Sequence, residues 1–277
     1  MRDLTGRPML IAGASSGIGA ATAVACAAAG MPVALGARRL EQLEAVAERC
    51  RQAGAAAVAI GLDVTDPEAC AEFVRRAESE LGPAYGVFAN AGWGAESPVL
   101  EMPAAEIRAM FETNLFGTIN VLHAAVPGMA QRGAGHALLC SSCLGLFPTP
   151  WYSVYSATKA AQHHLGRAMD LELRDQGVRV STVHPVGTKT EFFERMDERG
   201  PSLMAGTSER FMQPPEAVAR GIVRCLRKPR PEVWTSPTAM LGMKASALMP
   251  RLTNAVLRRV IVKRLAGQAG QAGQADG

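Results

Sequence analysis

Tyr155 and Lys159 are the residues of this sequence best suited to proton transfer. They lie four apart at the start of a stretch with helical spacing, so both side chains project from one helix face. A phenol has a pKa of about 10 and exchanges protons poorly at neutral pH, but a cation held beside it favours the phenolate. The spacing therefore predicts an acid–base pair, against the alternative of two ordinary residues on a helix surface.

A glycine motif, Gly13-Ala-Ser-Ser-Gly17-Ile-Gly19, follows the first apolar run and opens a helical stretch. Glycine lets the backbone turn tightly and approach a pyrophosphate, whose charge is met by the free N–H groups and the dipole of a helix start. Because the motif stands between a first strand and a first helix, it predicts a dinucleotide site. The expected contacts of this loop are Gly13, Ser15, Ser16, Gly17, Ile18 and Gly19.

The second apolar run leads into Gly36-Ala37-Arg38-Arg39, with no carboxylate before Glu41. Dinucleotide folds that use NAD have an acidic residue at this point for the ribose hydroxyls, whereas an arginine pairs with the 2′-phosphate of NADP. Arg38 therefore predicts NADP(H) in preference to NAD(H). The alternative is that the two arginines only solvate the start of a helix.

The elements that must position these residues alternate along the chain. Apolar runs occur at 9–12, 33–35, 56–62, 87–89, 137–140 and 178–183, and helical stretches at 18–29, 40–52, 67–81, 104–129 and 155–176. Such alternation predicts an α/β fold: a doubly wound, mostly parallel, Rossmann-like sheet with helices on both faces. Ligands bind such sheets beyond the carboxyl ends of the strands, so functional residues are expected directly after the apolar runs.

Several motifs, taken in order, resemble the short-chain dehydrogenases/reductases in their compact form. The resemblance runs from about Leu4 to Arg227. It rests on the glycine loop, Leu62-Asp-Val-Thr, Ala89-Asn90-Ala91-Gly92, Asn114 in a helix, Ser142 and Tyr155-Ser-Ala-Thr-Lys159, with Ser142 thirteen residues before Tyr155. It implies a carbonyl/alcohol oxidoreductase that uses a nicotinamide dinucleotide.

The resemblance also implies roles for individual residues. Tyr155 would be the general acid in carbonyl reduction, and the base in alcohol oxidation. Ser142 would polarise the substrate oxygen, with Ser141 as a nearby alternative. Lys159 would hold the nicotinamide ribose and tune Tyr155, while Asn114 would anchor a water that links Lys159 to solvent. The further cofactor contacts implied are Asp63, Val64, Asn90 and Thr190.

One segment departs from the family pattern. Where Pro-Gly is usual, the chain has His184-Pro185-Val186-Gly187, so the backbone near the nicotinamide is expected to differ there. Thr190 still aligns with the carboxamide-binding threonine of the family. The chemistry needs no metal, because two hydroxyls, one of them acidified by a lysine, stabilise the oxyanion that hydride transfer creates. The five histidines show no ligand spacing, so no metal site is predicted.

Other functions of the same motifs were weighed against this one. Sugar-nucleotide epimerases and dehydratases share Tyr-x3-Lys but have a GxxGxxG loop and a longer substrate domain than the residues after Thr190 provide. A non-catalytic, dinucleotide-binding regulatory protein on the same fold is the main alternative. A binding module has no need of the Tyr155 and Lys159 pair, which favours the enzyme.

The chain is interpreted as one Rossmann-like domain over 1–235, with 190–215 as a flap over the substrate. Residues 236–265 are expected to form a helical extension that helps to cover the cleft. Residues 266–277 carry Gly-Gln-Ala repeats and are expected to be disordered. Trp93, Phe147, Trp151, Phe192, Phe193 and Met196 suggest an apolar or bulky carbonyl or alcohol substrate.

Charge and composition bear on location and partners. Residues 220–277 hold 11 Lys and Arg against 2 acidic residues, whereas 1–219 hold 18 against 23. The basic segment has no clean polar helix face, so peripheral membrane contact is only a secondary expectation, and nucleic-acid binding is not expected. Six scattered cysteines and no signal or spanning segment predict free thiols in a cytoplasmic protein. The family resemblance implies that the protein forms a homo-dimer or homo-tetramer through the helices that contain Asn114 and Tyr155.

Overall fold

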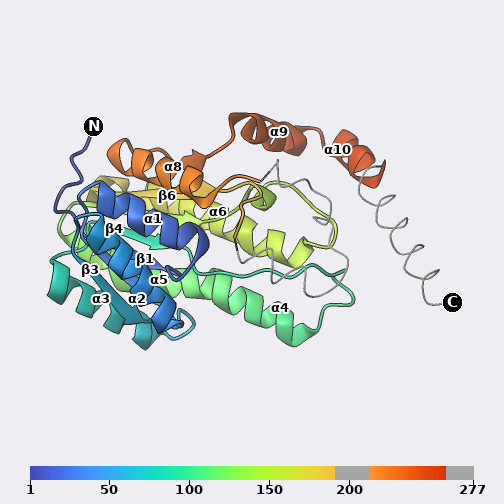
Figure 1. Ribbon diagram of the computed structural model, residues 1–277. Coiled ribbons are helices and arrows are strands. Elements are labelled where there is room, and N and C mark those ends of the chain that lie inside the picture. The colour runs from blue at the N-terminus through green and yellow to red at the C-terminus, as the bar shows by residue number, and fades with distance from the viewer. Residues whose placement is uncertain (191–211, 260–277) are drawn as a thin grey trace.

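The computed structural model describes residues 1–190 and 212–259, and within them one parallel sheet organises the chain. Its order is β3-β2-β1-β4-β5-β6-β7 (Figure 1). The strands are β1 (Met9–Ala12), β2 (Val33–Ala37), β3 (Ala57–Gly61), β4 (Gly86–Ala89), β5 (Gly135–Cys140), β6 (Val178–His184) and β7 (Glu232–Trp234). Strand order reverses between β1 and β4, and this switch point is where open α/β sheets bind ligands. The predicted doubly wound α/β fold is confirmed.

Helices cover both faces of the sheet (Figure 1). On one face, α1 (Gly17–Ala28), α2 (Leu40–Gln52) and α8 (Pro215–Arg227) pack into a core with the side chains of β1 and β2. On the other, α3 (Pro67–Leu81), α5 (Gly117–Gln131) and α6 (Ser153–Leu173) share a second core with β4 and β5. Strands β1, β4 and β5 are buried along their whole length, as expected for a parallel sheet covered on both sides.

The start of α3 illustrates how local sequence sets an element. The Asp66 carboxylate accepts hydrogen bonds from the backbone N–H groups of Glu68 (2.8 Å) and Ala69 (3.3 Å), and Pro67 occupies the first turn. These bonds satisfy N–H groups that have no partner within the helix. Asp66 and Pro67 therefore set the start of α3.

The helix expected over 104–129 is interrupted. It consists of α4 (Ala104–Phe111), a π-helical turn η1 (Glu112–Phe116) and α5. The N–H of Gly117 bonds to the carbonyl of Glu112, five residues earlier, which identifies the wider turn. Such π-turns cost backbone regularity and occur frequently at functional sites. Asn114 stands in the middle of this one.

Two elements near the C-terminus were not among the predicted ones. Strand β7 has three residues, too few for a recognisable pattern, and is set by pairing with β6. Helix α8 did carry a signal, because Val218, Ile222 and Leu226 recur at helical spacing after Pro215 and all three are buried.

Beyond β7, the chain forms α9 (Pro237–Leu248) and α10 (Pro250–Leu257), which lead away from the sheet (Figure 1). Helix α9 lies against η2 (Cys143–Gly145), the turn after Ser142, and Lys244 of α9 pairs with Glu232 at 2.8 Å. No helix in 1–190 or 212–259 is long and apolar enough to cross a membrane. All six cysteines are free thiols. Most of the expected flap (191–211) and the expected disordered tail lie outside the described residues.

Candidate active site

A cleft of about 880 Å³ opens at the carboxyl edge of the sheet. Its volume falls within the range of cofactor and ligand sites. The predicted site residues in its lining are Gly13, Ser15, Ser16, Gly17, Ile18, Arg38, Asp63, Val64, Asn90, Ser142, Tyr155, Lys159 and Thr190. Gly19 and Asn114 stand just behind this lining. One cleft is thus lined by residues that are far apart in the sequence, from Gly13 to Thr190.

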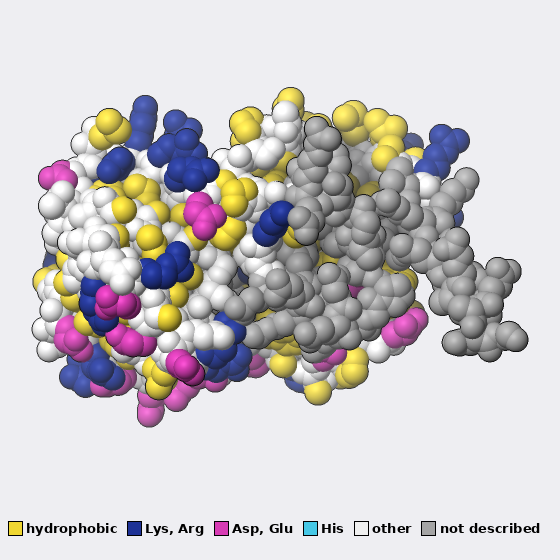
Figure 2. Space-filling model, in the orientation of Figure 1, with side chains coloured by type: hydrophobic (Ala, Val, Ile, Leu, Met, Phe, Trp, Pro, Cys, Tyr) yellow, Lys and Arg dark blue, Asp and Glu magenta, His cyan; other side chains and the backbone are white. Residues whose placement is uncertain are grey.

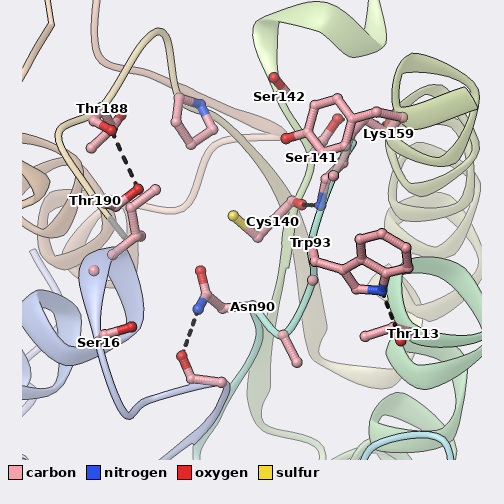
Figure 3. Close-up of a pocket in the computed structure, with 18 of the residues that line it drawn as sticks. Ser16, Asn90, Trp93, Thr113, Cys140, Ser141, Ser142, Lys159, Thr188 and Thr190 are labelled. Atoms are coloured by element: carbon pink, nitrogen blue, oxygen red, sulfur yellow. Dashed lines mark hydrogen bonds between the residues drawn. The ribbon is translucent and has the colours of Figure 1, made fainter. Parts of the chain in front are cut away.

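The glycine loop is built for close approach. A Cβ added at Gly19 would stand 2.1 Å from the carbonyl oxygen of Gly13 and 2.8 Å from Nδ2 of Asn90, so glycine is required there. The Asn90 amide donates to the same carbonyl at 2.8 Å and braces the loop from β4 (Figure 3). Ser16, the N-cap of α1, makes no side-chain cap bond, so its hydroxyl leaves the N–H groups of the helix start to a ligand. This cradle fits a dinucleotide pyrophosphate.

The far end of the cleft carries two arginines. Nη2 of Arg39 donates to the hydroxyls of Ser15 (3.0 Å) and Ser16 (2.9 Å), and so reaches back over the glycine loop. Arg38 lines the cleft near Asp63. The N–H and hydroxyl of Thr65 hold the pKa of Asp63 below its ordinary value, and Arg38 lowers it further. Arg38 was among the predicted site residues, whereas Arg39 was not.

Ser142 and Lys159 lie at the other end, between β5 and α6 (Figure 3). Tyr155 lines the same cleft and forms a hydrogen bond with Ser142. The Lys159 ammonium donates to the carbonyl of Cys140 at 2.7 Å and stands 5.6 Å from the centre of the Tyr155 ring. Ser142 caps η2, its hydroxyl oxygen accepting from the N–H of Leu144 at 3.2 Å. The Ser141 hydroxyl donates to the backbone carbonyl of Lys159 at 2.7 Å. Ser141 is therefore occupied in holding α6, which favours Ser142 over Ser141 for chemistry.

Burial governs the protonation of this group. It raises the pKa of the Tyr155 hydroxyl above its ordinary value, while the hydrogen bond with Ser142 lowers it. Burial lowers the pKa of Lys159 and raises that of the Cys140 thiol. At neutral pH Tyr155 is thus a neutral phenol beside a neutral thiol. A neutral phenol has a proton to give.

The side chain of Asn114 is held by the loop after β4 and by α6. Its Oδ1 accepts from the N–H of Trp93 at 2.9 Å, and its Nδ2 donates to the Trp93 carbonyl at 2.8 Å and to the Thr158 hydroxyl at 3.0 Å. A Cβ at Gly92 would meet Oδ1 of Asn114 at 3.0 Å and Nζ of Lys159 at 3.3 Å. The backbone of this loop therefore passes directly beside the lysine.

A buried glutamine also joins this group and was missed in the sequence. Gln162 accepts from the Lys159 ammonium at 2.9 Å and donates to the backbone carbonyl of Asn114 at 2.7 Å. No motif marks it, because its partner in η1 lies 48 residues earlier. The sequence indicates Gln162 only by its position, three residues after Lys159 and therefore on the same face of the helix.

The segment after β6 closes the cleft beside the glycine loop. The Thr190 hydroxyl donates to the carbonyl of Thr188 at 3.3 Å, and the Thr188 hydroxyl to the carbonyl of Val186 at 2.7 Å (Figure 3). A Cβ at Gly17 would touch the Thr190 methyl group at 3.0 Å. Thr190 thus faces the start of α1. Thr188, which was left out of the predicted set, also lines the cleft.

His184 supports the turn that carries Ser142. Its ring stacks on Trp234 with centroids 4.5 Å apart, and Nδ1 lies 3.2 Å from the Ser142 carbonyl. Burial lowers the pKa of His184 to about 4, so the ring is neutral at physiological pH and Nδ1 can donate to that carbonyl. The residue before Pro185 therefore fixes the backbone of Ser142.

Comparisons with known proteins agree with this geometry. The family model described as short chain dehydrogenase matches residues 7–200. The chain is 37% identical over 233 residues to a glycine betaine reductase of Emericella nidulans, matching 82% of this chain but only 18% of that protein. It resembles an alcohol dehydrogenase of Thermococcus sibiricus solved with 5-hydroxy-NADP (32% identity, TM-score 0.71, covering 81% of this chain and 91% of the other).

A further solved structure extends the fold match to more of the chain. It is a short chain dehydrogenase/reductase from Burkholderia phymatum in complex with NAD, with a TM-score of 0.82 and 23% identity. The match covers 91% of this chain and 96% of that one. At this identity it supports the fold alone.

Proposed function

This chain belongs to the short-chain dehydrogenase/reductase family, an NAD(P)-binding family of carbonyl/alcohol oxidoreductases, and we propose that it reduces an apolar or bulky carbonyl compound with NADPH. The observation that carries the proposal is the placement of Tyr155 in one cleft with Ser142 and Lys159. When bound, the dinucleotide supplies the hydride. An absorbance screen for oxidation of NADPH over aliphatic, steroid, acyl and aromatic carbonyls tests the proposal.

Ser142, Tyr155 and Lys159 each have a role in stabilising and protonating the carbonyl oxygen. Ser142 donates a hydrogen bond to the carbonyl oxygen and polarises it, and Tyr155 gives its proton to that oxygen as negative charge develops. Lys159 holds a positive charge behind the phenol, which stabilises the phenolate that remains. Donors already in place at a buried site meet the developing charge without reorganisation.

The protonation state of Tyr155 bears on the rates of the two directions of the reaction. Burial keeps its pKa above the ordinary value, so the phenol is protonated at neutral pH and serves as the acid of carbonyl reduction. Alcohol oxidation needs the phenolate as base, so its rate should rise with pH through the alkaline range. The ratio of the reduction rate to the oxidation rate should therefore fall as the pH rises.

The lining of the cleft supports an apolar substrate. Trp93, Leu144, Tyr152 and Val186 line its catalytic end, and buried Met102, Met110 and Val154 pack behind it. Of the other aromatic residues expected here, Phe147 and Trp151 are not in the described lining, and Phe192, Phe193 and Met196 lie outside the described residues. A bulky carbonyl compound is therefore the proposed substrate class.

We expect Arg38→Asp to shift cofactor preference from NADP(H) towards NAD(H) by about tenfold to a hundredfold in kcat/KM. The change removes a charge-assisted partner for the 2′-phosphate and adds a like charge, with Arg39 as the neighbouring cation. The ratio of kcat/KM values for the two cofactors measures the effect. Arg49→Asp, the same charge change at an exposed position of α2, is the control. An unchanged ratio in Arg38→Asp would refute the NADP assignment.

The alternative function is a dinucleotide-binding regulatory protein without catalysis. Such a protein would bind NADPH with the same loop and arginines, and it would leave every carbonyl of the screen unreduced. The placement of Ser142 and Lys159 around Tyr155 favours the enzyme, because binding alone does not require a proton donor in the cleft.

We propose further that the protein is a cytoplasmic homo-oligomer. Phe116 of η1 and Leu171 of α6 are 48% and 72% exposed, so the helices that carry Asn114 and Tyr155 each present an apolar side chain that packing between copies could cover. The mass in solution, by light scattering, tests this. We also propose that 190–215 forms a flap over the substrate and that 236–265 helps to cover the cleft.

The surface of α10 leads to a prediction about membranes. Leu252 and Val256 are 58% and 52% exposed, with Arg251 and Arg258 beside them, and this region is apolar and basic in Figure 2. We expect the protein to co-sediment weakly with vesicles that contain phosphatidylserine and less with phosphatidylcholine alone. The double substitution Leu252→Ser, Val256→Ser should abolish it, whereas Leu100→Ser, at another exposed leucine, should not. Equal sedimentation of all variants would refute a membrane contact through α10.

A further inference from the structure

Gln162 connects the Lys159 ammonium to the backbone carbonyl of Asn114, behind the proposed active site. It lies on α6, three residues after Lys159, and is fully buried. Its Oε1 accepts from the Lys159 ammonium at 2.9 Å. Its Nε2 donates to the backbone carbonyl of Asn114 and to the hydroxyl of Thr118, both at 2.7 Å.

The orientation of this amide is fixed by its partners. Lys159 can only donate, so the amide oxygen must face it, and the NH₂ group must face the acceptors. The Thr118 hydroxyl gives its own proton to the Asn114 carbonyl at 2.8 Å and can therefore accept from Gln162. Both N–H groups of the amide are thus used. The π-helical turn η1 holds the far side of the bridge.

The lysine has few other partners. Two of its three N–H groups are directed to the Cys140 carbonyl and to Gln162, and among the described residues no carboxylate pairs with it. The titratable groups that face it are Tyr155 on its own helix and Cys140 on β5, with Cys143 of η2 next to Tyr155. All are neutral at physiological pH because burial raises the pKa of each. A buried ammonium without a counter-ion needs neutral acceptors to remain charged.

We propose that Gln162 is a positioning residue: its amide, tied to Asn114, keeps the buried Lys159 ammonium charged and directs its remaining N–H towards the cleft. The family resemblance implies that Asn114 anchors a water that links Lys159 to solvent, and here the side chain of Gln162 also connects Lys159 to the Asn114 backbone. An amide held on three sides fixes geometry more firmly than an exchangeable water does. The role rests on the proposed function of the site, but the contacts and their effect on Lys159 do not depend on turnover.

The test follows protonation of Lys159 directly. Protein labelled with ¹³C at the lysine side chains is titrated by NMR, and the Lys159 signal is assigned by its loss in Lys159→Arg. In Gln162→Met, which keeps the length of the side chain and removes the amide, the ammonium should lose its proton about one to two pH units lower than in the wild type. Ser156→Ala, at another buried site of α6, should leave the titration in place.

The pH profile of alcohol oxidation gives a second readout. With less positive charge behind the phenol, the rising limb assigned to Tyr155 should move to higher pH in Gln162→Met, with KM for the alcohol little changed. If Gln162→Met does not fold, Thr118→Val decides in its place, with a smaller shift of Lys159 in the same direction.

An unmoved Lys159 titration in the folded Met variant, or in Thr118→Val where that variant decides, would overturn the inference. Absence of turnover in the wild type would instead count against the proposed function and leave the NMR result to stand by itself. The two failures are therefore distinguishable.

Discussion

Tyr155→Phe is expected to lower kcat for carbonyl reduction by about 10³-fold, with NADPH binding unchanged. The substitution removes the hydroxyl and keeps the buried ring, so the loss is that of the proton donor alone. Steady-state rates on the best substrate of the carbonyl screen, together with NADPH binding by fluorescence, measure the two quantities. A fall in kcat without a rise in the dissociation constant for NADPH is the expected pattern.

Tyr152→Phe is the matched control, because Tyr152 is a second phenol in the lining of the same cleft. Its hydroxyl donates to the Glu96 carboxylate at 2.7 Å, so it is already committed to a partner. We expect kcat in this variant to stay within about tenfold of the wild type. If instead Tyr152→Phe lost the activity and Tyr155→Phe kept it, the proton donor would be Tyr152 and the mechanism proposed above would be wrong.

The second large effect concerns the anchor of the catalytic helix. Asp170, near the end of α6, accepts from Nε of Arg179 and the N–H of Val180, both at 2.9 Å, and pairs with Arg174. Its side chain is 3% exposed. Asp170→Ala leaves Arg179 and a buried N–H of β6 without their partner. We expect a loss of about 3–5 kcal/mol in the free energy of unfolding, measured by chemical denaturation.

The pH dependence of this loss has a definite sign. Burial raises the pKa of Asp170, but hydrogen bonds from Arg179, Val180 and Arg174 outweigh it and bring the value to about 2. A depressed pKa contributes stability above the unfolded value and loses it as pH falls through the folded value. The difference between wild type and Asp170→Ala should therefore be full at neutral pH and shrink between about pH 4 and pH 2.

Asp175→Ala is the control for that experiment, since Asp175 is an exposed carboxylate a few residues further along. Its effect should stay within about 0.5 kcal/mol. A comparable loss in both variants would mean that removal of any acidic side chain in this region destabilises the chain. The anchoring role of Asp170 would then be discarded.

Local pattern was sufficient for most of the architecture. Buried parallel strands read as short apolar runs, and Met9–Ala12 forms a strand with the predicted bounds. Asp66 and Pro67 begin α3 because their effect on helix N–H groups is local. Strand β7 was not predicted because three residues are too few to show a period of two. Its position depends on pairing with β6.

The π-helical turn at Asn114 could not be predicted for a related reason. A continuous helical pattern over 104–129 does not show where the hydrogen bonding changes from i→i+4 to i→i+5. The position of the wider turn depends on contacts with α6, such as the bond from Gln162 to the Asn114 carbonyl. The side chain of Asn114 is likewise engaged by Trp93, a residue of a different loop. Tertiary contacts select the irregular turn.

The sequence by itself determined the fold class, the glycine loop after the first strand and the pairing of Tyr155 with Lys159 on one helix face. These follow from chain periodicity and from residue spacing within one or two turns. Only the tertiary structure decided that Arg39 reaches Ser15 and Ser16, that Ser141 is bonded to α6 while Ser142 lines the cleft, and that Gln162 bridges Lys159 to Asn114. The contacts of Arg39 with Ser15 and Ser16, of Ser141 with Lys159, and of Gln162 with Asn114 join residues 18 to 48 positions apart. No local rule specifies which side chains meet when a sheet brings such segments together.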